Sequence, residues 1–308
     1  MLRFEQFNAL AAIDKSENGR LLLKDLKKNM GADDEYNKVI AELLDAQLAA
    51  IDADEMLFVT EAGDKELEPY RVERAIIMAA GLGSRLMPVT INTPKPMVKV
   101  NGKKIIETLL DALVSVGIEE IYVVRGYLKE NFQLLLDKYP MIKFVDNPQY
   151  ATANSISSIY YAREHISNAY IMEADLYLSN PDILSRYQYK SNGLGIKAEK
   201  VEDWYFSAVD GRITRLNKYD VPADGESDLY TEVGISYVNG EDGKRLAKHI
   251  ADVFESEGGT EVYWDQVQYD IHIDEYDFAI RECLREDIVE IDSFKELVEI
   301  DNTYAISL

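Results

Sequence analysis

An apolar run passes directly into a glycine loop at Arg74-Ala-Ile-Ile-Met-Ala-Ala-Gly-Leu-Gly-Ser-Arg-Leu86. The residues up to Ala80 predict a buried β-strand that stops at glycine. Glycine allows a tight turn that brings several backbone N–H groups to one anion. Arg85 adds a planar set of donors suited to phosphate oxygens, and Lys95, in Thr93-Pro-Lys-Pro96, adds a compact positive charge. The sequence therefore predicts a phosphate-binding loop at the end of this strand.

Strand and helix patterns alternate after this loop. Residues 105–117 predict a helix closed by Gly117, and residues 168–175 predict an apolar strand that ends in acids. Such alternation favours right-handed βαβ units, so we expect an α/β domain with a Rossmann-like, mostly parallel sheet over residues 73–308. Ligands of such sheets bind beyond the carboxyl ends of the strands.

Residues 1–72 predict a separate small domain, joined to the α/β domain near Pro69. They read as three helices and a short hairpin, in which residues 56–63 form a strand that ends in a turn. This order resembles a winged helix-turn-helix domain, the shape of many bacterial regulators. Residues 1–70 hold 8 basic and 16 acidic side chains, and a net charge of −8 disfavours binding to DNA phosphates. A small appendage without a role at DNA and a nucleotide-sensing, DNA-binding regulator both stay open.

The charge of the chain is uneven. The whole sequence carries −23, which argues against binding to nucleic acid or to an anionic membrane. Residues 71–104 hold seven basic side chains and one acid, a net +6, and we expect a triphosphate to bind there. Residues 251–292 hold two basic and 14 acidic side chains. A single cysteine excludes an intrachain disulfide, and the first residues lack the pattern of a signal peptide, so we expect a cytoplasmic protein.

The segment Ala79-Ala-Gly-Leu-Gly-Ser-Arg85, followed by Pro94-Lys95, resembles the signature of nucleotidyltransferases that join an NTP to a phosphorylated metabolite. Within this family the chain is similar to the CTP:phosphocholine cytidylyltransferase branch. The segments that carry this likeness are Gly126-Tyr127-Leu128, the loop 147–158, Glu173-Ala-Asp-Leu176 and Tyr263-Trp-Asp265. The branch often has Asn-Asn where this chain has Asn154-Ser155, and a small residue and Pro in place of Lys103-Lys104.

The resemblance implies transfer of CMP from CTP to phosphocholine with release of pyrophosphate, by Mg²⁺-dependent in-line attack. Arg85 would contact the leaving pyrophosphate and Lys95 the α-phosphate or the acceptor phosphate. Asp175 and Asp265 would hold Mg²⁺, although other acids lie close to Asp265 in the sequence. The residues expected to bind CTP are Ala80, Gly81, Leu82, Gly83, Tyr127, Asn154 and Ser155.

Aromatic and acidic side chains after residue 180 suggest a site for a cationic amine. The candidates are Trp204, Tyr187, Tyr189, Tyr230 and Glu232. Residues 204–216 also read simply as a hairpin whose aromatic rings pack a lid. Other acceptors stay open: 2-aminoethylphosphonate, phosphoethanolamine and a sugar 1-phosphate. The oligomeric state stays open as well.

Overall fold

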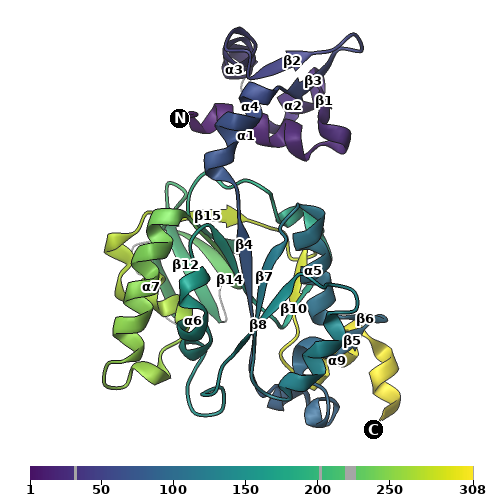
Figure 1. The fold of residues 1–308 in the computed structure, drawn as a ribbon, viewed down its shortest axis with the longest axis vertical. Helices are drawn as coiled ribbons and strands as arrows, with labels where there is room; N and C mark the ends of the chain where they lie inside the picture. Colours follow the sequence, from purple (N-terminus) through teal and green to yellow (C-terminus); the bar gives the residue numbers. More distant parts are fainter. Residues whose placement is uncertain (31–32, 201–202, 219–226, 308) are drawn as a thin grey trace. The chain divides into compact units, whose positions relative to one another are not determined.

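The computed structural model describes residues 1–30, 33–200, 203–218 and 227–307, which fall into two compact units (Figure 1). The first unit comprises Met1–Val72 and Ser185–Tyr189, and the second comprises Glu73–Leu184 and Lys190–Leu308. The chain therefore leaves the second unit for five residues and then returns to it. Among the described residues, no helix has the length and apolar character needed to cross a membrane.

The first unit packs helices against a small antiparallel sheet with strand order β1-β3-β2. Its elements are α1 (Phe4–Lys15), β1 (Arg20–Leu22), α2 (Leu23–Met30), α3 (Asp33–Asp45), β2 (Ala49–Ile51), β3 (Met56–Val59) and α4 (Glu61–Leu67). Leu10, Ile13, Leu26, Leu43 and Leu57 are fully buried in its core. Apolar residues at helical spacing on α1 and α3 account for this core, as the sequence pattern predicts.

The turn predicted after Val59 is instead the start of helix α4. Thr60 caps this helix, because its Oγ1 accepts a hydrogen bond from Gly63 N at 3.1 Å. A Cβ at Gly63 would lie 2.1 Å from the carbonyl oxygen of Leu48. The glycine therefore serves close packing inside a helix and does not end the strand in a turn.

Tyr187 and Tyr189 belong to the core of the first unit, which corrects their prediction as substrate-binding residues on a helix after Asp175. Tyr187 is 4% exposed, and the Tyr189 ring stacks on Tyr70 with centroids 5.5 Å apart. No helix covers residues 185–189. Core packing and a hydrogen bond from Tyr189 Oη to the Leu2 carbonyl occupy these side chains.

A nine-stranded sheet forms the centre of the second unit, with strand order β11-β15-β13-β12-β14-β9-β4-β7-β8. Its strands are β4 (Arg74–Ala79), β7 (Glu120–Arg125), β8 (Ile142–Asp146), β9 (Ala169–Glu173), β11 (Asn192–Ala198), β12 (Trp204–Val209), β13 (Arg212–Lys218), β14 (Asp228–Val238) and β15 (Ala279–Glu282). Two small pairs accompany it: β5 (Lys99–Val100) with β6 (Lys103–Lys104), and β10 (Leu176–Leu178) with β16 (Ile288–Glu290).

The sheet is mixed, whereas the sequence pattern predicts a mostly parallel one. The four strands β9-β4-β7-β8 are parallel to one another, but β14 joins β9 in the antiparallel sense. The strands β12, β13 and β14 form antiparallel pairs, including the hairpin β12–β13, whereas β15 pairs with β11 in the parallel sense. Asp210 and Gly211 turn that hairpin with φ of 50° and 74°, the positive values that a tight hairpin turn requires.

Helices cover the parallel strands. α6 (Ile156–Ala162) packs on α7 (Gly240–Phe254), and both bury apolar residues in the same core cluster as β4 and β7. Figure 1 shows α5 (Ile105–Ser115) on the other side of β4 and β7. The short helices α8 (Trp264–Gln266) and α9 (Phe294–Ile300) follow late in the chain. This leaves the carboxyl ends of β4 and β9 for the loops described below.

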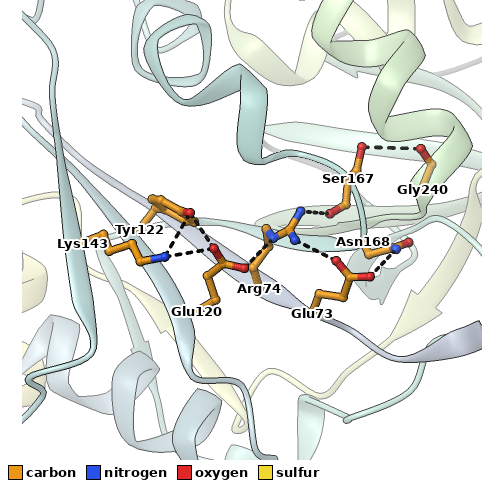
Figure 2. Close-up of polar contacts among 8 residues, drawn as sticks. All are labelled: Glu73, Arg74, Glu120, Tyr122, Lys143, Ser167, Asn168 and Gly240. Atoms are coloured by element: carbon orange, nitrogen blue, oxygen red, sulfur yellow. Dashed lines mark hydrogen bonds and ion pairs between the residues drawn. The ribbon is translucent and has the colours of Figure 1, made fainter. Parts of the chain in front are cut away.

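An ion-pair network secures the amino-terminal end of β4 (Figure 2). Arg74 donates to Glu120 on β7 at 3.0 Å, to Glu73 at 2.7 Å and to the Ser167 carbonyl before β9 at 3.1 Å. Lys143 on β8 also contacts Glu120, at 3.1 Å. Arg74 thus ties the parallel strands together at the end of β4 opposite to the glycine loop.

Candidate active site

The loop after β4 lines a cavity of about 400 Å³. Its backbone at residues 80–83 forms one wall, and Gly83 has a φ of 61°, which favours glycine. A Cβ at Gly83 would lie 2.9 Å from Cβ of Lys95, so the loop can approach the Lys95 segment this closely only with glycine there. The Gly83 carbonyl also accepts a hydrogen bond from Thr90 Oγ1 at 2.8 Å.

Lys95 links two carboxylates at the base of this cavity. Its Nζ lies 2.9 Å from Asp175 Oδ2 and 2.9 Å from Asp292 Oδ1, and the side chain is 10% exposed. Burial opposes the charged ammonium, but Asp175 and Asp292 outweigh it, so the pKa of Lys95 is raised. The ammonium of Lys95 therefore bridges the two carboxylates.

Arg85 extends this chain of charges toward solvent. Its Nη2 donates to Asp292 Oδ1 at 2.7 Å, and the side chain is 69% exposed. Although burial opposes it, Lys95 and Arg85 lower the pKa of Asp292. The order Asp175–Lys95–Asp292–Arg85 therefore sets two cations and two anions along one wall of the cavity.

Most of the basic island at residues 71–104 does not reach the cavity. Only Arg85 and Lys95 among its seven bases line the cavity in the described structure. The side chains Arg71, Arg74, Lys103 and Lys104 instead pair with acids elsewhere. A triphosphate site within the segment 71–104 stays a prediction, and the loop at residues 80–83, Arg85 and Lys95 are its candidates, because β4 carries Arg74 to the opposite end of the sheet.

Further acids interact with one another near Asp175. Glu173 lines the cavity, and Glu232, Asp265 and Glu290 interact with it electrostatically. Burial, followed by repulsion from the other carboxylates, raises the pKa of Glu173 well above its usual range and that of Glu290 to about 8. Burial also raises the pKa of Asp265 to about 6. Such crowding is relieved when a cation enters the cluster.

A divalent metal ion fits part of this cluster. Carboxylate oxygens of Glu173, Asp175 and Glu290 lie within 4.8 Å of one another. Asp175 Oδ1 is buried and has no hydrogen-bond partner among the described residues. Carboxylate oxygens are the donors that Mg²⁺ prefers, so the residues present suit a hard divalent cation.

Comparisons with known proteins agree with this geometry. Residues 74–193 match the Nucleotidyl transferase family. The chain is 42% identical over 238 residues to the 2-aminoethylphosphonate cytidylyltransferase of Lancefieldella rimae, which covers 76% of this chain and 94% of that protein. The chain belongs to the nucleotidyl transferase family. It is accordingly an enzyme, and several of its relatives are cytidylyltransferases.

One further relative and two solved structures are also similar to the nucleotidyltransferase. The choline-phosphate cytidylyltransferase of Streptococcus pneumoniae is 32% identical over 231 residues, covering 74% of this chain and 96% of that one. A solved structure of the CTP:phosphocholine cytidylyltransferase from Streptococcus pneumoniae superimposes with a TM-score of 0.68 at 31% identity, over 76% of this chain and 99% of that chain. A UDP-glucose pyrophosphorylase shares the fold at 15% identity, with a TM-score of 0.60, covering 77% of this chain and 100% of that one.

The structure brings most of the predicted phosphate- and nucleotide-binding residues of the nucleotidyltransferase to the cavity. The predicted residues that line it are Ala80, Gly81, Leu82, Gly83, Arg85, Lys95, Asn154, Ser155 and Asp175. Tyr127 lies outside the lining, because its hydroxyl donates to the carbonyls of Thr90 and Ile91 at 3.1 Å and 3.0 Å. It supports the loop that follows Arg85.

The residues predicted to bind the acceptor do not line the cavity. Trp204, Tyr230 and Glu232 are not among the lining residues, although Glu232 interacts with Asp175 and Asp265. Trp204 meets Tyr263, which does line the cavity, with ring centroids 5.6 Å apart. Tyr230 is 4% exposed and its hydroxyl donates to Glu282 at 3.0 Å. Tyr187 and Tyr189 pack in the first unit.

Sequence reasoning missed Asp292, which lines the cavity and pairs with Lys95, whereas Asp265 is not among the lining residues. Asp265 is 7% exposed and accepts a hydrogen bond from the Gln266 backbone at 3.0 Å. Asp292 follows the short strand β16 and precedes the capping residue Ser293 of α9. Asp292, like Asp175, lies within two residues of the end of a short strand, but the sequence pattern did not identify that strand.

Proposed function

We propose that this nucleotidyltransferase transfers CMP from CTP to 2-aminoethylphosphonate, with phosphocholine as the alternative acceptor. The observation that carries the proposal is a group of carboxylates centred on Glu173, which lines the cavity and interacts electrostatically with Glu232, Asp265 and Glu290. A primary ammonium has three N–H donors and can satisfy several carboxylates at once. The 42% identity to a 2-aminoethylphosphonate cytidylyltransferase supports the same acceptor.

A quaternary ammonium suits this arrangement less well. It donates no hydrogen bond and is held mainly by aromatic faces. Of the predicted rings, Trp204 contacts Tyr263 of the cavity lining, and Lys218 Nζ already lies 4.7 Å from the centre of the Trp204 ring. Two other rings predicted for the acceptor, Tyr187 and Tyr189, pack in the first unit.

The phosphates of CTP would lie against the loop at residues 80–83. Its backbone N–H groups, Arg85 and Lys95 provide positive potential at one wall of the cavity. An oxygen of the acceptor phosphonate attacks the α-phosphorus of CTP, the new P–O bond forms and pyrophosphate leaves. An oxygen of this kind is largely ionised near neutral pH, so the chain need not supply a general base.

Mg²⁺ would be held by Asp175, together with Asp292 or with Glu173 and Glu290. When bound, the ion neutralises charge that develops on the phosphates. Lys95, whose Nζ lies 2.9 Å from both Asp175 Oδ2 and Asp292 Oδ1, would bind a phosphate oxygen of the substrates. Arg85 is exposed and long enough to follow the leaving pyrophosphate. Positioning and charge neutralisation by these side chains provide the catalysis.

Pyrophosphate release tests this proposal. The full chain is incubated with Mg²⁺, each of the four NTPs in turn, and 2-aminoethylphosphonate, phosphoethanolamine, phosphocholine or glucose 1-phosphate. We expect release with CTP and the primary amines, and a kcat/KM for 2-aminoethylphosphonate at least about tenfold above that for phosphocholine. A preference for phosphocholine would overturn the choice of acceptor, and no release with CTP would overturn the cytidylyltransferase itself.

We propose in addition that the first unit is a winged-helix-like module. The order α1-β1-α2-α3-β2-β3, with β1 and β2 flanking β3, supports this. A net charge of −8 over residues 1–70 disfavours a role at DNA phosphates. We expect the full chain to leave fluorescent duplex DNA unbound at low salt, and salt-sensitive binding would favour the DNA-binding regulator instead.

A further inference from the structure

Two histidines and a glutamate meet at α7, away from the residues that line the active-site cavity. His249 lies on α7, whereas His272 and Glu275 follow the single π-helical turn Val267–Ile271. The two imidazole rings stack with centroids 3.8 Å apart and planes inclined by 12°. The reaction described above uses none of these side chains.

One carboxylate joins both rings. A Glu275 oxygen, Oε1, lies 3.0 Å from His272 Nδ1, and Oε2 lies 3.5 Å from His249 Nε2. One ligand atom from each of the three side chains lies within 4.8 Å of the other two. Ligands in a tetrahedral zinc site with bonds of about 2.0–2.1 Å are about 3.3 Å apart. Because imidazole lone pairs lie in the ring planes, the more exposed His272 ring would have to turn out of the stack for both rings to bind one ion.

A fourth side chain orients His249. Tyr276 Oη lies 2.9 Å from His249 Nδ1, and Tyr276 is 3% exposed. With the proton on Nδ1 donated to this hydroxyl, the lone pair of Nε2 is left for a ligand on the side of Glu275. Burial, followed by the neighbouring His272, also lowers the pKa of His249, which favours the neutral imidazole. Metal-binding histidines commonly have such a supporting partner.

We propose that His249, His272 and Glu275 form a second metal site, which binds Zn²⁺ or a similar late first-row ion with water as the fourth ligand. Two imidazoles and one carboxylate are a donor set that zinc uses when one position stays open. Imidazole suits such ions better than it suits Mg²⁺, whereas the active-site cluster offers oxygen alone. The two clusters would therefore select different metal ions by ligand chemistry.

The surroundings allow an ion to enter. The side chains of His272 and Glu275 are 25% and 52% exposed, so the site opens to solvent on their side. Arg245 and Asp252 add charges of opposite sign near His249. A bound ion would join α7 to the segment that follows the π-helical turn, and we expect it to stabilise the packing of these elements and leave the reaction unchanged.

Titration of the untagged, chelator-treated full chain with Zn²⁺ tests this site. Millimolar Mg²⁺ is present throughout to occupy the oxygen cluster, and binding is followed by calorimetry and by the melting temperature. We expect one Zn²⁺ per chain and a raised melting temperature. Both effects should be lost in His272→Ala and in Glu275→Gln. Tyr276→Phe should retain the fold but weaken binding by about 10–100-fold.

A matched control is the third histidine of the chain. His165 stacks on Tyr122 with centroids 3.7 Å apart, and His165→Ala should bind Zn²⁺ like the original chain. NMR of the imidazole nitrogens should show Zn²⁺-dependent shifts of His249 and His272 and an unshifted His165. The absence of binding, or binding retained by both His272→Ala and Glu275→Gln, would overturn the proposal.

Discussion

Lys95 Nζ lies 2.9 Å from Asp175 Oδ2, so the cation expected to meet phosphate is held by the carboxylate expected to meet the metal. The same ammonium contacts Asp292 at 2.9 Å. The ammonium of Lys95 therefore lies between the two carboxylates, and both would lose this partner if the lysine were replaced.

Lys95→Met should lower kcat by about 10²–10³-fold, because a preorganised positive group at the phosphates is lost. It should also destabilise the metal-free chain by about 1–3 kcal/mol, since Asp175 and Asp292 lose their shared partner. Mg²⁺ should restore part of the lost melting temperature. Equal melting temperatures for the variant with and without Mg²⁺ would contradict this account.

Asp292→Asn should reduce activity far more than Asp265→Asn. Asp292 shares a cation with Asp175, whereas Asp265 is enclosed beside Gln266. We expect Asp292→Asn to raise the Mg²⁺ concentration needed for half-maximal activity by at least about tenfold. Mg²⁺ titrations of both variants, with pyrophosphate release as the readout, compare them directly. The reverse order of effects would restore Asp265 as the second ligand.

Gly83→Ala should destabilise the chain by about 1–2 kcal/mol. The φ of 61° is strained for alanine, and the added Cβ would lie 2.9 Å from that of Lys95. Denaturant unfolding measures the change. Gly81→Ala is the matched control, because a Cβ there meets nothing within 4 Å and its φ is not positive. Equal losses in both variants would argue against the close approach at Gly83.

Glu232→Gln should weaken the binding of the acceptor more than the binding of the nucleotide. The variant keeps an oxygen to accept the 2.6 Å hydrogen bond from Gly234 N but loses the charge that would attract an ammonium. We expect the KM for 2-aminoethylphosphonate to rise about tenfold, which corresponds to about 1.4 kcal/mol, and the KM for CTP to change little. A parallel rise in both values would place Glu232 outside the acceptor site.

Glu120 should contribute to stability in acid. The hydrogen bond from Tyr122, helped by Lys143 and Arg74, lowers the pKa of Glu120 to about 2 (Figure 2). Its stabilisation is thus present above pH 4.5 and is lost as the pH falls toward 2. Because the side chain is 34% exposed, we expect a contribution of about 1 kcal/mol.

Melting temperatures of Glu120→Gln between pH 2 and 7 test this contribution. The variant should be less stable than the original chain at neutral pH, and the two curves should converge in acid. Glu119→Gln, at an exposed neighbouring position, serves as the control. A constant difference between Glu120→Gln and the original chain across this range would show that the carboxylate charge is not responsible.

The sequence pattern predicts the centre of the α/β unit well, because its signals are local. The apolar run at Arg74–Ala79 forms β4, and Gly83 allows the turn of the cavity loop. The position of Asp292 depends on the three-residue strand β16, which pairs with β10 more than a hundred residues earlier. Pairing over that distance leaves no periodic signal in the sequence.

Charge counted along the chain is a weaker guide than position in the sheet. Arg74 and Lys95 belong to the same basic segment, yet β4 carries Arg74 to the end opposite to the cavity. Tyr187 and Tyr189 illustrate the same limit. Their aromatic character suggests ligand binding. Residues 185–189 nevertheless belong to the first unit, and this depends on tertiary contacts that no local sequence pattern predicts.

The five residues Ser185–Tyr189 also bear on how the gene can be divided. They complete the core of the first unit, although they are encoded within the nucleotidyltransferase portion. A cut after Val72 would therefore separate Phe7 and Tyr70 from Tyr189, whose ring they contact. The first unit would lose part of its core, and the remaining chain would keep Tyr187 and Tyr189 without the residues on which they pack. The two units are distinct in the fold, yet no single cut in the chain separates all the residues of one unit from those of the other.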